Sequence, residues 1–213
     1  MKELIDLNIS LISDSKKHGD EIADFFGVKH YEFPADYFNM ALNTITMTVE
    51  LLDYYRSIWE SASVHGYTSE KIDLIREENG QRVNQIQKMC FISLMSSFEF
   101  VAKNIVMRNE DVFGTFNGRI YLSGIMKRSE SKALLTKEDL NLWNGMITLR
   151  NILVHNNGIS DVNEEYNYPD VTVVLIDGCM TKGNLRFFPL LSKWILINAR
   201  SWLENINQQL KLI

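Results

Sequence analysis

The strongest constraint in this sequence is the spacing of its apolar residues between positions 38 and 105, which follows the period of an α-helix in two successive stretches. Steps of three and four residues predict a helix with one buried face in each stretch. The apolar positions of the first stretch are Phe38, Leu42, Ile45, Val49, Leu52 and Trp59, and those of the second are Val83, Ile86, Cys90, Leu94, Phe98, Val101 and Ile105. Two long helices joined by a short turn are expected to pack antiparallel, as in a helical bundle.

Local signals set the expected ends of these helices. Pro34 suits the first turn of the first helix, and Gly66 suits its end. The second helix is expected to start near Thr68 and to be interrupted at Asn79-Gly80. Residues 1–33 predict an N-terminal helical extension, with a helix that ends near Phe25-Phe26-Gly27.

The middle of the chain has weaker periodicity. Residues 110–136 contain three glycines and no clear period, which predicts a long loop with one helical turn. Thr136 is then the expected N-cap of a helix whose first turn carries Asp139. That helix is expected to end at Asn156-Asn157-Gly158.

A small strand pair is expected before the last helix. Residues 171–176 form a β-prone run, and we expect them to pair with residues 184–188 across a loop that starts at Asp177-Gly178. Pro189 then opens a C-terminal amphipathic helix. The fold class predicted is therefore mostly α, an antiparallel helical bundle with a small β-hairpin before the C-terminal helix. We find no repeat or linker, so residues 1–213 are interpreted as a single domain.

Composition excludes several classes of protein. The longest uncharged run is the thirteen residues from Tyr37 to Val49, too short to span a bilayer, and the acidic residues near the N-terminus do not fit a secretory signal. Cys90 and Cys179 are too far apart in sequence for a zinc knuckle. The histidines are scattered, and no P-loop, dinucleotide-binding or zinc-protease motif is present, so we expect neither a metal nor a cofactor. The sequence predicts a soluble cytoplasmic protein without membrane contact.

Charge is distributed unevenly. The net charge of −5 argues against a protein that holds nucleic acid over a wide surface. Residues 119–137, however, carry five basic side chains against Glu130 alone. This basic segment has two readings, a phosphate-attracting strip or a solvated mobile loop. Any nucleic-acid binding is therefore expected to be local and selective.

The segment richest in chemical signals is Leu149-Arg150-Asn151-Ile152-Leu153-Val154-His155-Asn156-Asn157-Gly158. Arginine offers a permanent forked cation that matches phosphate oxygens, and histidine exchanges a proton near neutral pH. The five-residue offset turns Arg150 and His155 about 140° apart on an ideal helix. We expect them to converge on one phosphate only if the helix loosens near His155 or if a second copy completes the site. Asn151 and His155 share a face.

This segment resembles the HEPN superfamily, whose hallmark is R-x(4–6)-H with a polar residue after the arginine. The resemblance covers about ten residues, and the helical setting fits it. It implies a dimeric α-helical bundle in which two such motifs share one cleft, and an activity as a metal-independent endoribonuclease of a toxin–antitoxin, phage-defence or RNA-processing system.

The resemblance also implies roles for four residues. Arg150 would hold the scissile phosphate, His155 would act as general acid or base, and Asn151 would assist. Glu99 is the candidate for the glutamate that approaches this cleft from the preceding helix, because it is a lone carboxylate in an apolar stretch. The implied partners are a second copy of the chain, an RNA substrate and an antitoxin-like protein.

Alternatives to this interpretation stay open. The chain is a non-catalytic module of the same fold that binds a nucleotide, RNA or a partner protein, or it is a purely structural helical dimer in which Arg150 and His155 face solvent unpaired. Arg150 and His155 could also simply cap a helix C-terminus, where cations interact favourably with the helix dipole. For Glu99, pairing with Arg150 or another buried cation is an alternative to a catalytic role.

Overall fold

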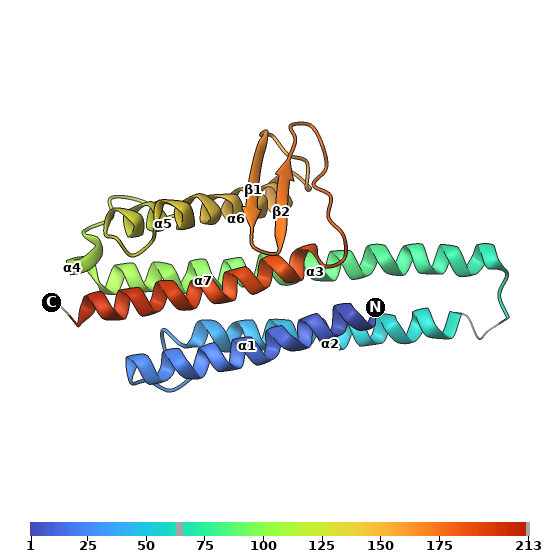
Figure 1. Cartoon of the computed structure of the whole chain (residues 1–213), viewed down its shortest axis with the longest axis horizontal. Helices are drawn as coiled ribbons and strands as arrows, with labels where there is room; N and C mark the ends of the chain where they lie inside the picture. The colour runs from blue at the N-terminus through green and yellow to red at the C-terminus, as the bar shows by residue number, and fades with distance from the viewer. Residues whose placement is uncertain (63–65, 212–213) are drawn as a thin grey trace.

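The computed structural model describes residues 1–62 and 66–211 and shows a mostly helical protein (Figure 1). The helices are α1 (Lys2–Phe26), α2 (Asp36–Ala62), α3 (Ser69–Arg108), α4 (Glu110–Phe113), α5 (Leu122–Ser131), α6 (Lys137–His155) and α7 (Phe187–Leu210). The strands are β1 (Glu164–Tyr168) and β2 (Val171–Leu175), which form an antiparallel hairpin before the last helix. The predicted fold class is confirmed.

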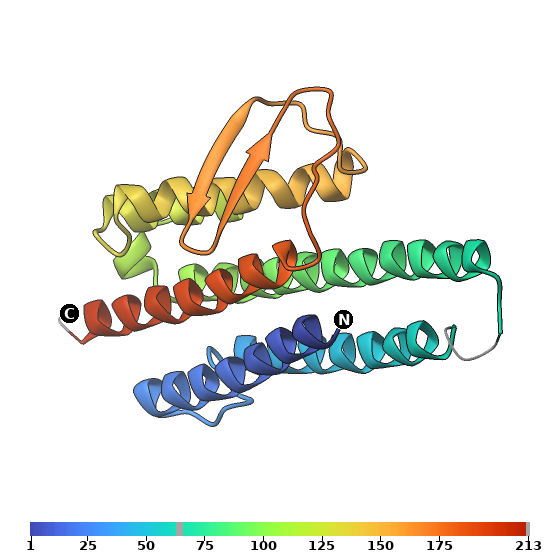
Figure 2. The same cartoon turned by 45° about the vertical axis from the view of Figure 1, so that its right-hand side comes forward.

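The elements lie in three layers (Figure 2). The antiparallel pair of α1 and α2 forms the first layer, and α3 and α7 form the middle one. The third layer contains α5, α6 and the hairpin, which packs on α6. The middle of α3 therefore contacts both outer layers.

Helix ends follow the local signals. Gly27 closes α1 in the left-handed conformation, with φ of 67°. Thr68 caps α3 by accepting a hydrogen bond from the Lys71 backbone N–H, and Thr136 and Asp139 form a reciprocal capping box at the start of α6. These ends confirm the predictions for Gly27, Thr68 and Thr136. The start of α2 differs slightly, because its first helical residue is Asp36 and Pro34 precedes it.

Two expectations for the middle of the chain are wrong. First, α3 continues through Asn79-Gly80 without a break. Glycine lowers helix stability by only about 1 kcal/mol, which a helix packed along α2 can tolerate. Second, residues 110–136 contain two helices, α4 and α5, instead of a loop with one turn. The sequence of α5 shows no clear helical period, because only three of its ten residues, Leu122, Ile125 and Met126, are apolar and buried.

The partner predicted for strand β2 is also wrong. β2 pairs with residues 164–168, in the register Tyr166↔Val173 and Tyr168↔Val171, and not with residues 184–188. In the pair, Tyr166 and Tyr168 face the core together with Val173 and Leu175. Residues 187 and 188 instead begin α7, with Pro189 in its first turn.

The hairpin docks on α6 at Gly145. An added Cβ at this glycine would lie 2.5 Å from the Tyr168 hydroxyl oxygen and 2.6 Å from Cγ of Tyr166. The Tyr168 hydroxyl donates a hydrogen bond to the backbone carbonyl of Leu142 at 2.8 Å. Burial raises the pKa of Tyr168, so this hydroxyl remains a donor at neutral pH. Gly145 thus permits the close approach of the two tyrosines to α6.

Aromatic side chains form the centre of the core. Phe98 of α3 is stacked on Trp143 of α6, with ring centroids 4.7 Å apart, and makes edge contacts with Trp202 of α7 and Tyr37 of α2. Trp143, Trp194 and Trp202 are buried, as their positions on helix stripes predicted. Trp59 is half-buried and lies below the Arg76 guanidinium.

One described helix, α3, is long and apolar enough to cross a membrane by length and composition, with a mean hydropathy of 1.4 over 18 residues. Half of that window is buried inside the protein. A core helix of a soluble protein meets the same criterion, so α3 is weak evidence for a membrane span and is compatible with the soluble protein that we predicted.

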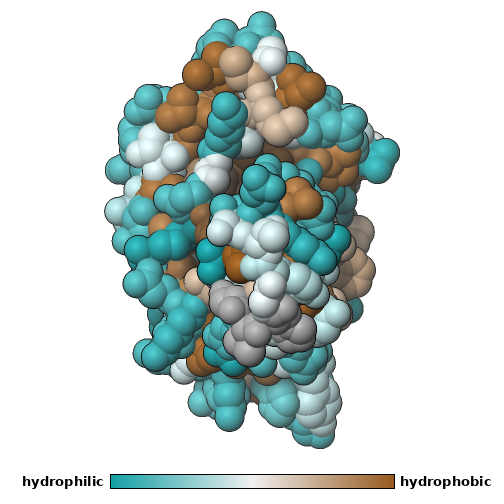
Figure 3. Space-filling view, turned by 90° about the vertical axis from the view of Figure 1, so that its right-hand side faces the viewer, coloured by the Kyte–Doolittle hydropathy of each residue, from teal (hydrophilic) through white to brown (hydrophobic). Residues whose placement is uncertain are grey.

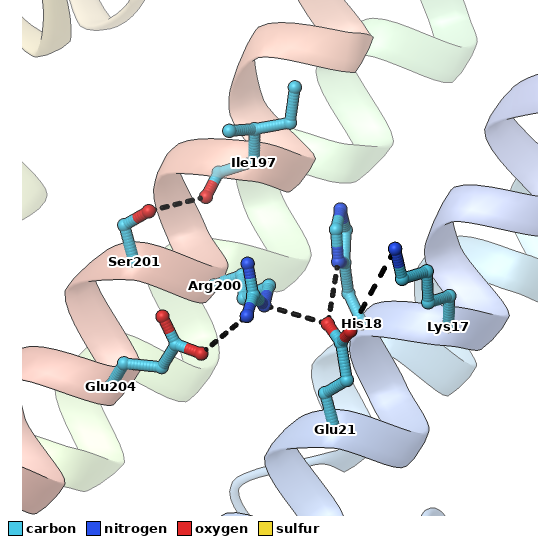
Figure 4. A network of polar contacts seen from close by, with 7 residues as sticks. All are labelled: Lys17, His18, Glu21, Ile197, Arg200, Ser201 and Glu204. Atoms are coloured by element: carbon cyan, nitrogen blue, oxygen red, sulfur yellow. Dashed lines mark hydrogen bonds and ion pairs between the residues drawn. The ribbon is translucent and has the colours of Figure 1, made fainter.

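The first layer is attached to α7 by a polar network (Figure 4). Glu21 of α1 forms an ion pair with Nε of Arg200 at 2.8 Å, and Lys17 and His18 lie on its other side. Arg200 also pairs with Glu204 at 2.7 Å. Glu21 is therefore the carboxylate that joins cations of two helices.

We expect Gly145→Ala to lower the free energy of unfolding by about 1–2 kcal/mol, because the overpacking of Tyr166 and Tyr168 outweighs the gain in helix propensity. Gly80→Ala is the matched control. An added Cβ there meets no atom within 4 Å, so this variant should be about 0.5–1 kcal/mol more stable than the wild type. Urea denaturation measures both, and equal stability of the two variants would contradict the described docking.

Glu21→Gln should lower the free energy of unfolding by about 1 kcal/mol at low salt, and by less in concentrated NaCl, because the lost contacts are partly exposed ion pairs. Glu204→Gln removes only a contact within α7 and should have a smaller effect. Thermal unfolding at two salt concentrations tests the difference, and a larger loss for Glu204→Gln would show that Glu21 does not join the layers.

Candidate functional site

A cleft of about 670 Å³ lies where the C-terminal third of α3, the C-terminal half of α6 and the segment before α5 meet. Most of the residues that line it are polar or charged. These are Glu99, Lys103, Arg119, Tyr121, Thr148, Arg150, Asn151, Ile152, His155, Asn156 and Asp161. All four residues that the sequence singled out, Glu99, Arg150, Asn151 and His155, therefore border one cavity.

The burial of Phe98 sets the position of the next residue, Glu99. Phe98 is fully buried among aromatic rings, and the next residue on the helix is turned by about 100°, toward the rim of the core. The Glu99 carboxylate forms an ion pair with Nζ of Lys103 at 2.6 Å and lies 4.0 Å from Nη2 of Arg150. Both side chains of the Glu99–Arg150 pair are about three-quarters or more buried. The alternative in which Glu99 pairs with Arg150 is thus present in the geometry.

Arg150 is held by side chains and not by the end of its own helix. Its Nη1 donates to Oδ1 of Asn151 at 3.1 Å, and its Nη2 approaches Glu99. Its Nε is buried without a hydrogen-bond partner among the described residues. The guanidinium consequently has a donor that no side chain of the cleft satisfies.

His155 is the last residue of α6 and is exposed to solvent. Backbone groups satisfy the end of this helix, because the N–H groups of Asn156 and Gly158 both donate to the carbonyl of Ile152. The imidazole makes no hydrogen bond or ion pair within residues 1–62 and 66–211. The capping alternative is therefore weaker for His155 and Arg150, since neither side chain bonds to a terminal carbonyl.

The backbone turns sharply after His155, and backbone hydrogen bonds hold the segment that follows. Asn157 and Gly158 both have positive φ, of 53° and 86°. Beyond them, Ser160 and Cys179 pair through the Ser160 N–H, and the Thr181 N–H donates to the carbonyl of Gly158. The loop that carries Asp161 into the cleft is thereby tied to the segment after β2.

α6 stays helical through His155, so the first of the two conditions for convergence, a loosened helix, is not met. Arg150 and His155 are separated by about 7.5 Å along an ideal helix axis. They border the cleft at different levels instead of meeting at one point. A substrate that contacts both residues of one chain must extend along the cleft.

Sequence reasoning missed Lys103, Tyr121 and Asp161 as lining residues. Lys103 could have been found, because it follows Glu99 at the i+4 spacing of helical ion pairs. Tyr121 and Asp161 carry no comparable local signal, since they reach the cleft from separate segments.

The basic segment 119–137 does not act as one surface. Arg119 alone of its cations lines the cleft. Arg128 is structural, because its Nη1 donates to the carbonyls of residues 113, 114 and 115 and its guanidinium lies 3.7 Å from the ring centroid of Phe116. Lys127, Lys132 and Lys137 are exposed and lie outside the lining. The phosphate-attracting strip is thus reduced to one arginine.

The cleft is locally cationic in an acidic protein. Lys103, Arg119 and Arg150 face two carboxylates, Glu99 and Asp161, so a neutral His155 leaves an excess of one positive charge. Within the described part of the chain, Arg119 and Asp161 make no ion pair. In the same residues, no group of three or more His, Cys, Asp or Glu side chains could hold a metal ion. The arrangement suits an anion such as a phosphodiester.

Comparison with protein-family models, with curated proteins and with solved structures finds no match for this chain. The likeness to the HEPN superfamily therefore still rests on the motif around Arg150 and His155.

We expect Glu99→Gln to lower the free energy of unfolding by about 1 kcal/mol at low salt, because Lys103 and Arg150 lose their shared counter-charge. Sulfate should restore part of this loss more effectively than chloride at equal ionic strength, since an anion that binds the folded state stabilises it. Thermal shift in the two salts is the measurement. Glu78→Gln, which removes the exposed pair with Arg82 on the same helix, should show no preference for sulfate.

Proposed function

We propose that this protein is an endoribonuclease of the HEPN type that needs no metal ion and acts as a homodimer. The observation that supports this proposal best is the convergence of Arg150, Asn151, His155 and Glu99 on one cleft with excess positive charge. A toxin–antitoxin or phage-defence setting, with an antitoxin-like partner, is part of the same proposal.

The proposed reaction is an internal transesterification of RNA. The 2′-oxygen forms a bond to the adjacent phosphorus while the bond from phosphorus to the 5′-oxygen breaks, which leaves a 2′,3′-cyclic phosphate and a free 5′-hydroxyl. His155 accepts the proton of the 2′-hydroxyl as general base. The forked cation of Arg150 stabilises the additional negative charge on the phosphate oxygens. DNA lacks the attacking hydroxyl and is not a substrate in this scheme.

The leaving 5′-oxygen needs a proton. In the proposed homodimer, the histidine of the second copy donates it, so each chain supplies one half of the acid–base pair. This arrangement accords with the separation of Arg150 and His155 along α6, because one chain alone does not bring them to a single point.

An exposed apolar surface supports the presence of a partner near the site. Seen from the end of the molecule, apolar residues gather toward the hairpin (Figure 3). The exposed apolar residues of this region are Ile159, Val174, Ile176 and Met180. Ile159 pairs with Met180 through an isolated bridge and follows His155 closely in sequence.

A non-catalytic module that binds RNA, a nucleotide or a partner protein is the second candidate. The ion pairs of Glu99 favour it, because a carboxylate that is already paired with Lys103 and Arg150 has a structural role in the free protein. Within residues 1–62 and 66–211, His155 also lacks the orienting hydrogen-bond partner that many catalytic histidines have.

Cleavage of single-stranded and structured RNAs in EDTA tests the first candidate. His155→Ala should lower the rate by about 10²- to 10⁴-fold and Arg150→Ala by about 10²- to 10³-fold, because each removes one element of transition-state stabilisation. His30→Ala and Arg82→Ala are matched controls, since both residues are outside the cleft, and they should keep the wild-type rate.

Cleavage that disappears in EDTA but persists in both site variants would refute the assignment. Efficient cutting of all-DNA substrates would refute the mechanism. Tight RNA binding without turnover, lost in Arg150→Ala, would favour the non-catalytic module, and sedimentation of a monomer at working concentration would refute the composite site.

A further inference from the structure

Two residues of the cleft, Arg119 and Tyr121, have no part in the proposed reaction. Both belong to the segment before α5, which forms a separate wall of the cleft beside those formed by α3 and α6. Tyr121 also borders a smaller cavity of about 80 Å³ that it shares with Glu99, Arg150 and Asn151. The segment therefore reaches the same site from the side.

The two side chains form one unit. The Arg119 guanidinium carbon lies 5.3 Å from the centroid of the Tyr121 ring, which is the range of a cation–π contact. Tyr121 is 53% exposed, a large value for a tyrosine that borders a cavity. Among the described residues, Arg119 has no carboxylate partner. The pair thus presents to the cleft a half-exposed ring and a cation that lies over that ring but pairs with no carboxylate among the described residues.

This combination matches the chemistry of an unpaired nucleotide. Bases stack on exposed aromatic rings whatever their sequence, because every base has a π face, and arginine binds phosphate oxygens through its forked donors. A base within a duplex is already stacked on its neighbours and cannot occupy such a ring. The neighbouring Arg150 adds a second cation a short distance along the cleft.

We propose that Arg119 and Tyr121 form a subsite that binds one nucleotide of single-stranded RNA beside the phosphate held by Arg150. The base stacks on Tyr121, and Arg119 contacts the phosphate next to the reacting one. This proposal rests on the proposed function for the position of the reacting phosphate. It assigns single-stranded RNA as the substrate class, because only an unstacked base can reach the ring.

The chain contains a matched pair outside the cleft. Lys29 and Tyr31 have the same spacing in sequence, the cation lies 5.6 Å from the ring centroid, and Tyr31 is 54% exposed. Their surroundings differ, because Asp20 and Asp24 border the same hollow and repel a phosphate. We therefore expect no RNA binding at this pair, and Tyr31→Ala and Lys29→Ala serve as controls.

Binding is measured by fluorescence anisotropy with a labelled 2′-O-methyl RNA of about eight nucleotides, which cannot be cleaved and falls within the usual size of single-strand sites. Tyr121→Ala should weaken the affinity by about 5- to 100-fold, and Tyr121→Phe, which keeps the ring, by no more than about threefold. Arg119→Ala should weaken binding and lower the slope of log affinity against log salt by about 0.7, the value for one phosphate contact on a single strand. The same oligonucleotide annealed to its complement should bind more weakly than the single strand.

Several outcomes would overturn the subsite. These are a Tyr121→Ala affinity equal to that of Tyr31→Ala, duplex binding as tight as single-strand binding, and no binding by the wild type. Circular dichroism of each variant checks that the exposed substitutions leave the fold intact.

Cleavage assays separate this proposal from the proposed function. Loss of binding in Tyr121→Ala without any RNA cleavage by the wild type supports the subsite and refutes the ribonuclease. Cleavage that depends on His155 but is unaffected by Tyr121→Ala and Arg119→Ala supports the ribonuclease and refutes the subsite.

Discussion

The stacking of Phe98 on Trp143 is the contact on which most of the structure depends. One ring of α3 joins α6 by stacking and joins α7 and α2 through its edge contacts with Trp202 and Tyr37. Aromatic pairs of this kind add about 0.5–1.5 kcal/mol each beyond the burial of their surface. Because Phe98 fixes the rotation of α3 against α6, it also fixes where Glu99 stands relative to Arg150. The core and the candidate site are therefore set by neighbouring residues of one helix.

The parts of the fold that a single sequence could predict are those that local chemistry determines. Most of α2 (Asp36–Ala62) and the part of α3 from Val83 to Ile105 follow from apolar spacing, and the ends at Gly27 and Thr136 follow from capping. The partner of β2 could not be found in this way. Residues 164–168 alternate two tyrosines with polar residues and have little β-branched character, and their pairing depends on the room that Gly145 leaves on α6. Such a long-range fit leaves no local signal.

The same distinction holds for the site. Arg150, Asn151 and His155 are contiguous enough to form a recognisable segment, and Glu99 stands out as a carboxylate in an apolar helix. Arg119, Tyr121 and Asp161 reach the cleft from segments that no periodicity connects to it. In the proposed subsite, Arg119 and Tyr121 extend the proposed phosphate site to a whole nucleotide. The net charge of −5 is an average that does not reveal the cationic cleft. The uneven distribution of charge along the sequence had indicated that a local positive surface was possible.

The forty residues of α3 form one continuous helix, but their neighbours change along its length. Around Phe98 the helix is enclosed by three others, whereas near Val83 its buried contacts shrink to a small cluster with Leu4, Ile5 and Leu52. The N-terminal part of α3 extends beyond α7 and lies beside the end of α2 (Figure 1). Local opening therefore costs least free energy at that tip and most at the core, and amide hydrogen exchange along α3 should slow from Ser69 toward Glu99. The cleft is built on the end of the helix that opens last, so its geometry persists while the distant tip unfolds and refolds.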